Sequence, residues 1–382
     1  MNKLFTFFSQ LKNVIAFSQL PKEDRLLTFY SEGLNYWAYL GGLMQTILDT
    51  SDITVCYLTA SPQDPALEVD HPRLKTFIIG ESFIRDWMFA NIDTKVIVMT
   101  MPDLHQYQVK RSVNDVHYVY VQHSLVSLHM VYRPGAFDHY DTIFCAGPHH
   151  IDEIRALEAA ANLPAKHLFK HGYARLDALK AESSEPSKPK KTRDLTSKHY
   201  LLAPSWGENG TIESGLGEKI VDLLLANGQI VTLRPHPQTL KFARDKIDAI
   251  THKYKDHANF TSETNVRGQA SLQASDIMIS DWSGAALDYA FGLGKPVLFL
   301  DVDRKVNNPD YKNIPFKPFE VTIRDHIGRI IEPGQIETLL DSDDPQCPPK
   351  LAENYVFNIG NSDQIGAAEI IRLVQDISIK ET

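Results

Sequence analysis

The stretch SDIMISDWSGAALDYAFGLGKPVLFLD, residues 275–301, contains two short apolar runs on either side of a helical pattern. The runs DIMIS (276–280) and PVLFLD (296–301) are continuously apolar rather than alternating, which is typical of strands covered on both faces. The helical segment begins directly after the first run, near residue 283. This order of strand, helix and strand predicts one βαβ unit of a parallel sheet.

The same alternation extends over the rest of the chain. In the second half, HYLLAPSW (199–206) and QIVTLRPHP (229–237) are followed by helical patterns near 212–227 and 239–255. The first half contains further strand-like runs: LLTFYS (26–31), ITVCYLTAS (53–61), KVIVMTMP (95–102), VHYVYVQHS (116–124) and DTIFCAG (141–147). Both halves therefore read as α/β units with parallel sheets.

The polar segment AESSEPSKPKKTRDLTSK (181–198) separates the two halves and reads as a linker because it is rich in proline and charge. We predict an α/β fold with two domains whose parallel sheets face a central cleft. Ligands of such sheets bind outside the carboxyl ends of the strands. The predicted parts are an amphipathic helix (1–25), an N-terminal domain (26–185), a linker (186–198), a C-terminal domain (199–360) and a helix that can cross back (361–382).

The composition excludes several classes of protein. A net charge of −9 argues against a nucleic-acid-binding surface, because phosphate neutralisation needs an excess of Lys and Arg. The three cysteines, Cys56, Cys145 and Cys347, are far apart and have no CxxC spacing, which fits a reducing, cytoplasmic location. No run of 18 uncharged apolar residues exists that could span a membrane.

The first twenty residues, MNKLFTFFSQLKNVIAFSQL, form an amphipathic pattern with two alternative interpretations. They are too polar for a signal peptide and lack a cleavage site. The helix either packs on the fold or lies on a membrane surface, which would place the protein at the inner face of the cell membrane. The apolar residues that share much of one face are Leu4, Phe5, Phe8, Leu11, Ile15 and Phe17.

The start of the helix after DIMIS is a candidate phosphate site. A helix N-terminus has unpaired N–H groups and the positive end of the dipole, so it binds phosphate without a metal or cofactor. Ser280, Asp281 and Ser283 follow the strand, and Gly284 lets a ligand approach the backbone. Asp288 lies one turn further on, within reach of a ribose hydroxyl. The alternative is a simple N-cap.

RPHP (234–237) places an imidazole between two prolines, which restrict the backbone on both sides of His236. Arg234 lies on the same side of the extended chain. The pair suits a diphosphate, because Arg binds oxygens and His donates a proton or hydrogen bond. The alternative is a structural histidine in a turn.

His123 follows the run 116–122 in the other half, so the fold predicts two imidazoles facing each other across the cleft. One would activate an acceptor hydroxyl while His236 stabilises the leaving group. The alternative for His123 is a buried histidine bonded to a backbone carbonyl. Arg133, Ser205 and Trp206 are further candidates for acceptor or cleft contacts.

At these residues the chain resembles the CDP-glycerol glycerophosphotransferase family, the TagB/TagF-like enzymes of teichoic acid and capsule synthesis. The motifs that carry the resemblance are QHS (122–124), GYARLD (172–177), LAPSW (202–206), RPHP (234–237) and SDWSGAALDYAFGLGKPVLFLD (280–301), and YSEGLNYW (30–37) also fits. The chain departs from the family pattern after His123, where the usual glycine is missing, and at Gly284, where a serine is usual.

The resemblance implies a GT-B fold of two Rossmann-like domains, an acceptor domain (26–185) and a nucleotide-donor domain (199–360). It also implies transfer of a polyol phosphate, most simply glycerol phosphate, from a CDP-activated donor to a hydroxyl of a polymer or lipid-linked acceptor, with release of CMP. It implies His123 as base, His236 with Arg234 on the diphosphate, and Ser280, Asp281, Ser283 and Asp288 at the donor. The alternatives are a GT-B glycosyltransferase using a CMP- or UDP-sugar, a UDP-N-acetylglucosamine 2-epimerase-like enzyme, and an inactive nucleotide-binding scaffold of a capsule-assembly complex.

Overall fold

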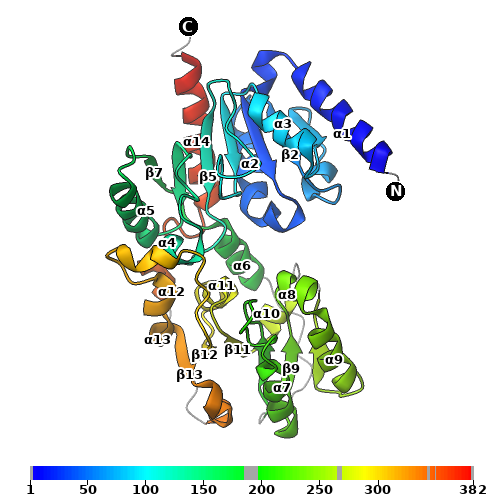
Figure 1. Cartoon of the computed structure of the whole chain (residues 1–382), viewed down its shortest axis with the longest axis vertical. Coiled ribbons are helices and arrows are strands. Elements are labelled where there is room, and N and C mark those ends of the chain that lie inside the picture. The colour runs from blue at the N-terminus through cyan, green and yellow to red at the C-terminus, as the bar shows by residue number, and fades with distance from the viewer. Residues whose placement is uncertain (1–2, 185–196, 265–268, 342–344, 349, 380–382) are drawn as a thin grey trace.

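The computed structural model describes residues 3–184, 197–264, 269–341, 345–348 and 350–379. It contains two α/β domains, one above the other in Figure 1, each built on a parallel sheet. This confirms the predicted fold class. Residues 186–196 of the predicted linker lie outside the described part of the chain.

The N-terminal domain has a seven-stranded sheet of order β3-β2-β1-β4-β5-β6-β7, and all pairings are parallel. Its inner strands are buried on both faces, as their continuous apolar sequences predict. The strands are β1 (Leu27–Ser31), β2 (Val55–Thr59), β3 (Leu74–Ile78), β4 (Val96–Met99), β5 (His117–Val121), β6 (Thr142–Cys145) and β7 (His167–Lys170). The helices are α1 (Lys3–Ser18), α2 (Trp37–Thr50), α3 (Phe83–Asn91), α4 (Leu128–Val131), α5 (Pro148–Ala161) and α6 (Ala174–Ser184).

The C-terminal domain has a six-stranded parallel sheet of order β10-β9-β8-β11-β12-β13. The strands are β8 (His199–Leu202), β9 (Ile230–Leu233), β10 (Phe260–Ser262), β11 (Ile277–Ser280), β12 (Val297–Leu300) and β13 (Gly328–Ile331). The helices are α7 (Leu216–Ala226), α8 (Pro237–Phe242), α9 (Arg244–Tyr254), α10 (Ala270–Ala274), α11 (Gly284–Leu293), α12 (Phe319–Thr322) and α13 (Arg324–Ile327), and α14 (Ser362–Ile379) follows this domain in the chain. The βαβ unit predicted at 275–301 is β11-α11-β12.

Helix packing contributes to the contact between the domains. α14 returns to the N-terminal domain and packs on α2, as Figure 1 shows for the red helix. α6 packs on α11, where Leu176 and Leu179 share a buried apolar cluster with Tyr289 and Phe291. A Cβ on Gly292 would lie 3.1 Å from the Leu179 side chain, so the glycine permits this close approach.

Helix α1 packs on the N-terminal domain along only one of its faces. Val14 and Phe17 are buried, and the Phe17 ring meets Phe77 of β3 edge to face at 5.7 Å. Phe8, Leu11 and Ile15 on the other face are exposed. Among the described residues, no helix is long and apolar enough to cross a membrane.

Candidate active site

A cleft of about 610 Å³ lies between the two domains at the carboxyl ends of both sheets. Its C-terminal wall includes the loops after β8 and β11, where the strand order of that sheet changes direction. Loops that diverge at such a point leave a crevice, which is the usual ligand site of an open α/β sheet. The volume lies within the range of pockets that hold a small-molecule substrate or cofactor.

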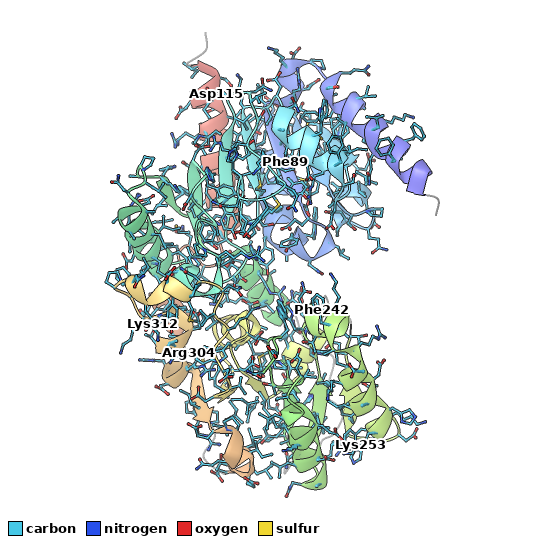
Figure 2. The ribbon with its side chains drawn as sticks, viewed as in Figure 1. Phe89, Asp115, Phe242, Lys253, Arg304 and Lys312 are labelled. Atoms are coloured by element: carbon cyan, nitrogen blue, oxygen red, sulfur yellow. The ribbon has the colours of Figure 1, made fainter. Side chains whose placement is uncertain are left out.

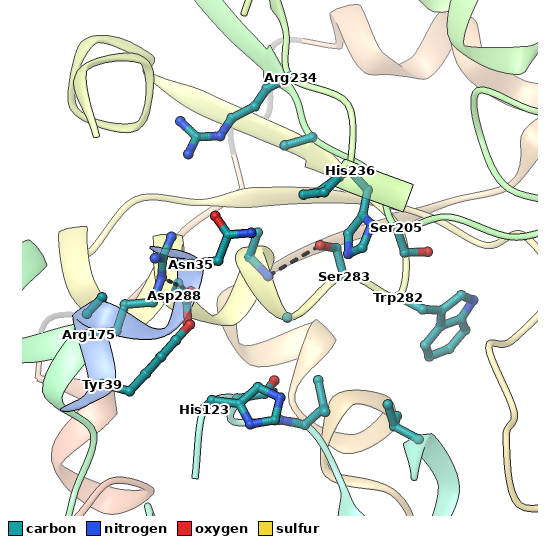
Figure 3. A pocket seen from close by; sticks show the side chains of 18 of the residues that line it. Asn35, Tyr39, His123, Arg175, Ser205, Arg234, His236, Trp282, Ser283 and Asp288 are labelled. Atoms are coloured by element: carbon teal, nitrogen blue, oxygen red, sulfur yellow. Dashed lines mark hydrogen bonds and ion pairs between the residues drawn. The ribbon is translucent and has the colours of Figure 1, made fainter. Parts of the chain in front are cut away.

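His236 lies in this cleft and is held by the backbone (Figure 3). Pro237 begins α8, and His236 is its N-cap: Nδ1 accepts a hydrogen bond from the backbone N–H of Gln238 at 3.1 Å. An accepting Nδ1 has no proton, so the neutral ring carries its proton on Nε2. Burial, with the nearby Lys305 charge as a second cause, lowers the pKa of His236 to about 4. At neutral pH the imidazole is therefore an uncharged hydrogen-bond donor.

Arg234 lies at the end of β9 and lines the same wall of the cleft. Its guanidinium is buried, donates to the Ser271 hydroxyl at 2.8 Å, and pairs with Glu263 at 3.4 Å. These contacts hold a cation in place two residues before His236.

The N-terminus of α11 faces the cleft through Ser283, Gly284 and Ala285. Ser283 is the N-cap, and its hydroxyl accepts from the Ala285 N–H at 3.3 Å, the bond drawn at this helix in Figure 3. The simple N-cap interpretation is therefore correct for Ser283, and the positive end of a ten-residue helix still points at the cleft. A Cβ on Gly284 would lie 2.8 Å from the Ser124 hydroxyl, so glycine lets the N-terminal domain come close.

Ser280 and Asp281 do not line the cleft, which corrects the prediction that they contact the donor phosphates. The Ser280 hydroxyl donates to the Ala203 carbonyl at 2.8 Å. The buried Asp281 carboxylate accepts from the Ser205 N–H at 2.6 Å and from the Thr211 hydroxyl at 2.7 Å. Both side chains thus fix the loop after β8 instead of meeting a ligand.

His123 lies across the cleft from His236 and follows β5 of the other domain (Figure 3). Its Nδ1 lies 3.0 Å from the Tyr120 hydroxyl. Desolvation lowers the pKa of His123 to about 4, and a hydrogen bond to the Thr100 backbone only partly opposes this. Rings that surround the imidazole within 5.6–6.2 Å belong to Tyr36, Tyr39, Tyr120 and Tyr132. The cleft thus contains two neutral imidazoles, one from each domain.

Asp288 lines the cleft but is already paired, with a residue that the sequence did not single out. Arg175 of α6 donates from Nε to Asp288 Oδ2 at 2.6 Å, across the domain interface (Figure 3). Burial raises the pKa of Asp288, while the Arg175 charge acts against this rise. Asp288 Oδ1 is buried and has no hydrogen-bond partner among the described residues, so it can accept one from a ligand hydroxyl.

The sequence interpretation treated GYARLD as scaffold bordering the cleft, and thereby missed Arg175. The sequence feature that could have identified this residue was the presence of an arginine in the GYARLD motif. Lys305 was also missed, because it lies in a loop without a motif, yet it lines the cleft beside His236.

The three further candidates from the sequence are placed differently. Ser205 lines the cleft. The Trp206 ring lies beside that of His236, with the centroids 6.2 Å apart. Arg133 lies instead at a second cavity of about 330 Å³, where it pairs with Asp103 at 3.4 Å, which corrects its assignment to the main cleft.

The charge of the cleft suits a phosphate ligand. Three cations line it, Arg175, Arg234 and Lys305, against the one carboxylate of Asp288. In the part of the chain that the structure describes, no group of three or more His, Cys, Asp or Glu side chains could hold a metal ion. The three side-chain cations and the N-terminus of α11 are the groups that phosphate charge would meet in this cleft.

Two Rossmann-like domains around a cationic cleft define a GT-B architecture. The sequence model of the CDP-Glycerol:Poly(glycerophosphate) glycerophosphotransferase family matches residues 133–313, just under half of the chain. The match confirms, for this part of the chain, the resemblance found in the motifs. The protein is accordingly an enzyme of the glycerophosphotransferase type. No curated protein matches the sequence significantly.

Solved structures share the fold at low sequence identity. The chain is similar to the wall teichoic acid polymerase TagF, solved as an H444N variant with CDPG, at 15% identity and a TM-score of 0.59, covering 98% of this chain and 95% of that one. It is also similar to the UDP-GlcNAc 2-epimerase of Methanocaldococcus jannaschii, at 12% identity and a TM-score of 0.55, covering 91% and 98%. The chain is similar to S. aureus MnaA, solved with UDP, at 11% identity and a TM-score of 0.56, covering 90% of this chain and 94% of that one.

Proposed function

We propose that the enzyme transfers glycerol phosphate from CDP-glycerol to a hydroxyl of a teichoic-acid-like or capsule polymer and releases CMP. The observation that carries this proposal is the pair of neutral imidazoles on opposite walls of a cationic cleft. The family match supports the glycerophosphoryl group and the CDP donor.

In this reaction the acceptor oxygen forms a bond to the β-phosphorus, and the bond from that phosphorus to the bridging oxygen breaks. CMP leaves with the electron pair of the broken bond. His123 takes the proton of the acceptor hydroxyl, which its neutral form allows. His236 donates a hydrogen bond from Nε2 to the diphosphate, and Arg234 and the N-terminus of α11 stabilise its charge.

Asp288, further along α11, provides a contact for the nucleoside of the donor. The orphaned Oδ1 of Asp288 can accept a hydrogen bond from a ribose hydroxyl, while Arg175 holds the other carboxylate oxygen. The closest alternative, transfer of a sugar from a CMP- or UDP-sugar, would use the same cations. We include UDP-GlcNAc among the donors to be tested because the fold is similar to that of a UDP-GlcNAc 2-epimerase.

A panel of donors tests the proposal. Purified enzyme is incubated with CDP-glycerol, CDP-ribitol, CMP-Kdo, CMP-sialate or UDP-GlcNAc and a glycerol-phosphate oligomer, and nucleotide release is measured. We expect CMP release from CDP-glycerol above all others. Turnover of only a nucleotide sugar would refute the proposal, and nucleotide binding without any turnover would favour the inactive scaffold.

We further propose that the acceptor is met at a membrane surface, through the exposed apolar face of α1 and α3. The two helices are joined by a hydrogen bond from Ser82 to Gln10 at 3.1 Å, and the side chains of α1 project from the outer side of the domain (Figure 2). α1 has lysines but no acidic residue, although the whole chain has a net charge of −9. This charge and the apolar face suit an anionic lipid surface. The face consists of Phe7, Phe8, Leu11 and Ile15 of α1 and Phe83 and Trp87 of α3.

Sedimentation with vesicles of phosphatidylglycerol and phosphatidylcholine tests this face. The double variant Phe83→Ser/Trp87→Ser should lose vesicle binding without loss of stability, because both side chains are at least half exposed. Phe242→Ser is the matched control, since Phe242 is 67% exposed on α8 of the other domain (Figure 2). Equal vesicle binding by all variants would refute the membrane face, and a change of oligomeric state in the double variant would instead assign the face to a second copy of the chain.

A further inference from the structure

The cations of the cleft differ in whether the protein itself neutralises them. Arg175 donates to Asp288 at 2.6 Å, and Arg234 pairs with Glu263 at 3.4 Å. Lys305 also lines the cleft, but it forms no ion pair with any described residue. A charge withdrawn from water is stable only when it is paired or bound to a ligand. Among the three cations of the cleft, Lys305 is thus the one that has no carboxylate partner among the described residues.

The surroundings of Lys305 place it at the phosphate end of the cleft. It lies in the loop after β12, is half-buried, and its Nζ is 4.7 Å from the centroid of the Trp206 ring. Its charge contributes to the lowered pKa of His236, so the two groups are close. Burial also lowers the pKa of Lys305 itself, and the charge of Asp281 only partly compensates.

We propose that Lys305 binds the diphosphate of a nucleoside diphosphate donor and supplies a cation that, unlike Arg175 and Arg234, has no carboxylate partner among the described residues. This inference rests on the proposed function for the identity of the donor, but not for the anionic class of the ligand. The ammonium would form a charge-assisted hydrogen bond to a non-bridging oxygen beside His236. Contact with Trp206 alone is the competing explanation, since a cation over an aromatic ring is a stable arrangement by itself.

Lys241 provides a matched control for that explanation. Its Nζ lies 5.1 Å from the centroid of the Phe242 ring in the same domain, but it does not line the cleft. Lys305→Met and Lys241→Met therefore remove the same charge and the same type of ring contact. Only the first removes a cation from the cleft.

The test is calorimetric binding of CDP, CMP, UDP and cytidine to the wild-type enzyme and to both variants, with thermal unfolding of each protein alone. We expect Lys305→Met to bind CDP about 10- to 100-fold more weakly, as for loss of a hydrogen bond to a charged group. Cytidine binding should not change, Lys305→Arg should retain most of the CDP affinity, and Lys241→Met should behave as wild type. Without ligand, Lys305→Met should unfold at the wild-type temperature or above, because it removes an unpaired half-buried charge.

Wild-type CDP affinity in Lys305→Met would overturn the inference and leave the proposed function intact. Loss of both cytidine affinity and thermal stability would also overturn it, because Lys305 would then be a packing residue. If the wild-type enzyme binds UDP rather than CDP and Lys305→Met weakens UDP, the inference holds and CDP-glycerol is the wrong donor. Failure of the wild type to bind any nucleoside diphosphate would refute both.

Discussion

His236 has two separable roles in the structure, and two substitutions distinguish them. Its Nδ1 caps α8 by accepting from the Gln238 N–H, and its Nε2–H is available to the donor diphosphate. His236→Asn keeps a good N-cap but loses the imidazole, because Asn caps helices as well as any residue. His236→Ala loses both the cap and the ring.

The expected magnitudes follow from these two contacts. Loss of a donor aimed at developing charge lowers kcat about 10²- to 10³-fold, so both variants should lose activity to this extent. Loss of an N-cap costs about 1 kcal/mol of unfolding free energy, so only His236→Ala should be less stable. The pKa of His236 is about 4, so this residue should cause no change in kcat/KM between pH 6 and 8.

The assay is CMP release from CDP-glycerol at saturating donor, with urea unfolding of the same preparations. A His236→Asn enzyme within a few-fold of wild-type kcat would refute the role of the imidazole at the diphosphate. Equal loss of stability in both variants would refute the assignment of the cap, since Asn would then fail to replace Nδ1.

Three further predictions concern the cleft and its walls. Buried histidines with lowered pKa should make the protein less stable in acid: unfolded imidazoles take up protons near pH 6.5, so the free energy of unfolding, measured in urea, should be highest above that pH and fall towards pH 4. Gly284→Ala places a Cβ 2.8 Å from the Ser124 hydroxyl, so it should weaken CDP binding measured by calorimetry, and Ser124→Gly should restore it. Asp288→Asn removes the negative charge that pairs with the buried Arg175 and should lower the unfolding free energy by about 3 kcal/mol, whereas the double variant with Arg175→Met should lose less than the sum of the single changes. The buried histidines in the prediction on acid stability are His123, His149, His150, His171 and His236.

Local sequence was sufficient to predict the fold class, because strands buried on both faces need continuous apolar runs. The segment 275–301 illustrates this, since its two runs became β11 and β12 with α11 between them. The order of strands was not predictable in the same way. It depends on which strands pair across crossovers, as β8 does with both β9 and β11.

The site was predicted in part, and the errors have a common cause. Ser280 is the last residue of β11 and Asp281 and Ser283 follow it, but of these three only Ser283 lies at the cleft. The other two side chains bond to the loop after β8, about 70 residues earlier in the chain. Side chains that are adjacent in sequence can point in opposite directions at a turn. Which of them reaches the cleft depends on hydrogen-bond partners in another part of the chain, here the loop after β8.

The sequence by itself determined the features that depend on neighbouring residues: the strands, the prolines around His236, and the helix N-terminus at Ser283. Only the tertiary structure decided which residues meet across the cleft. It paired Arg175 with Asp288, 113 positions apart, and left Lys305 in the cleft without a carboxylate partner among the described residues. Burial and ion pairing depend on distances in space, and a local pattern of residues does not contain those distances.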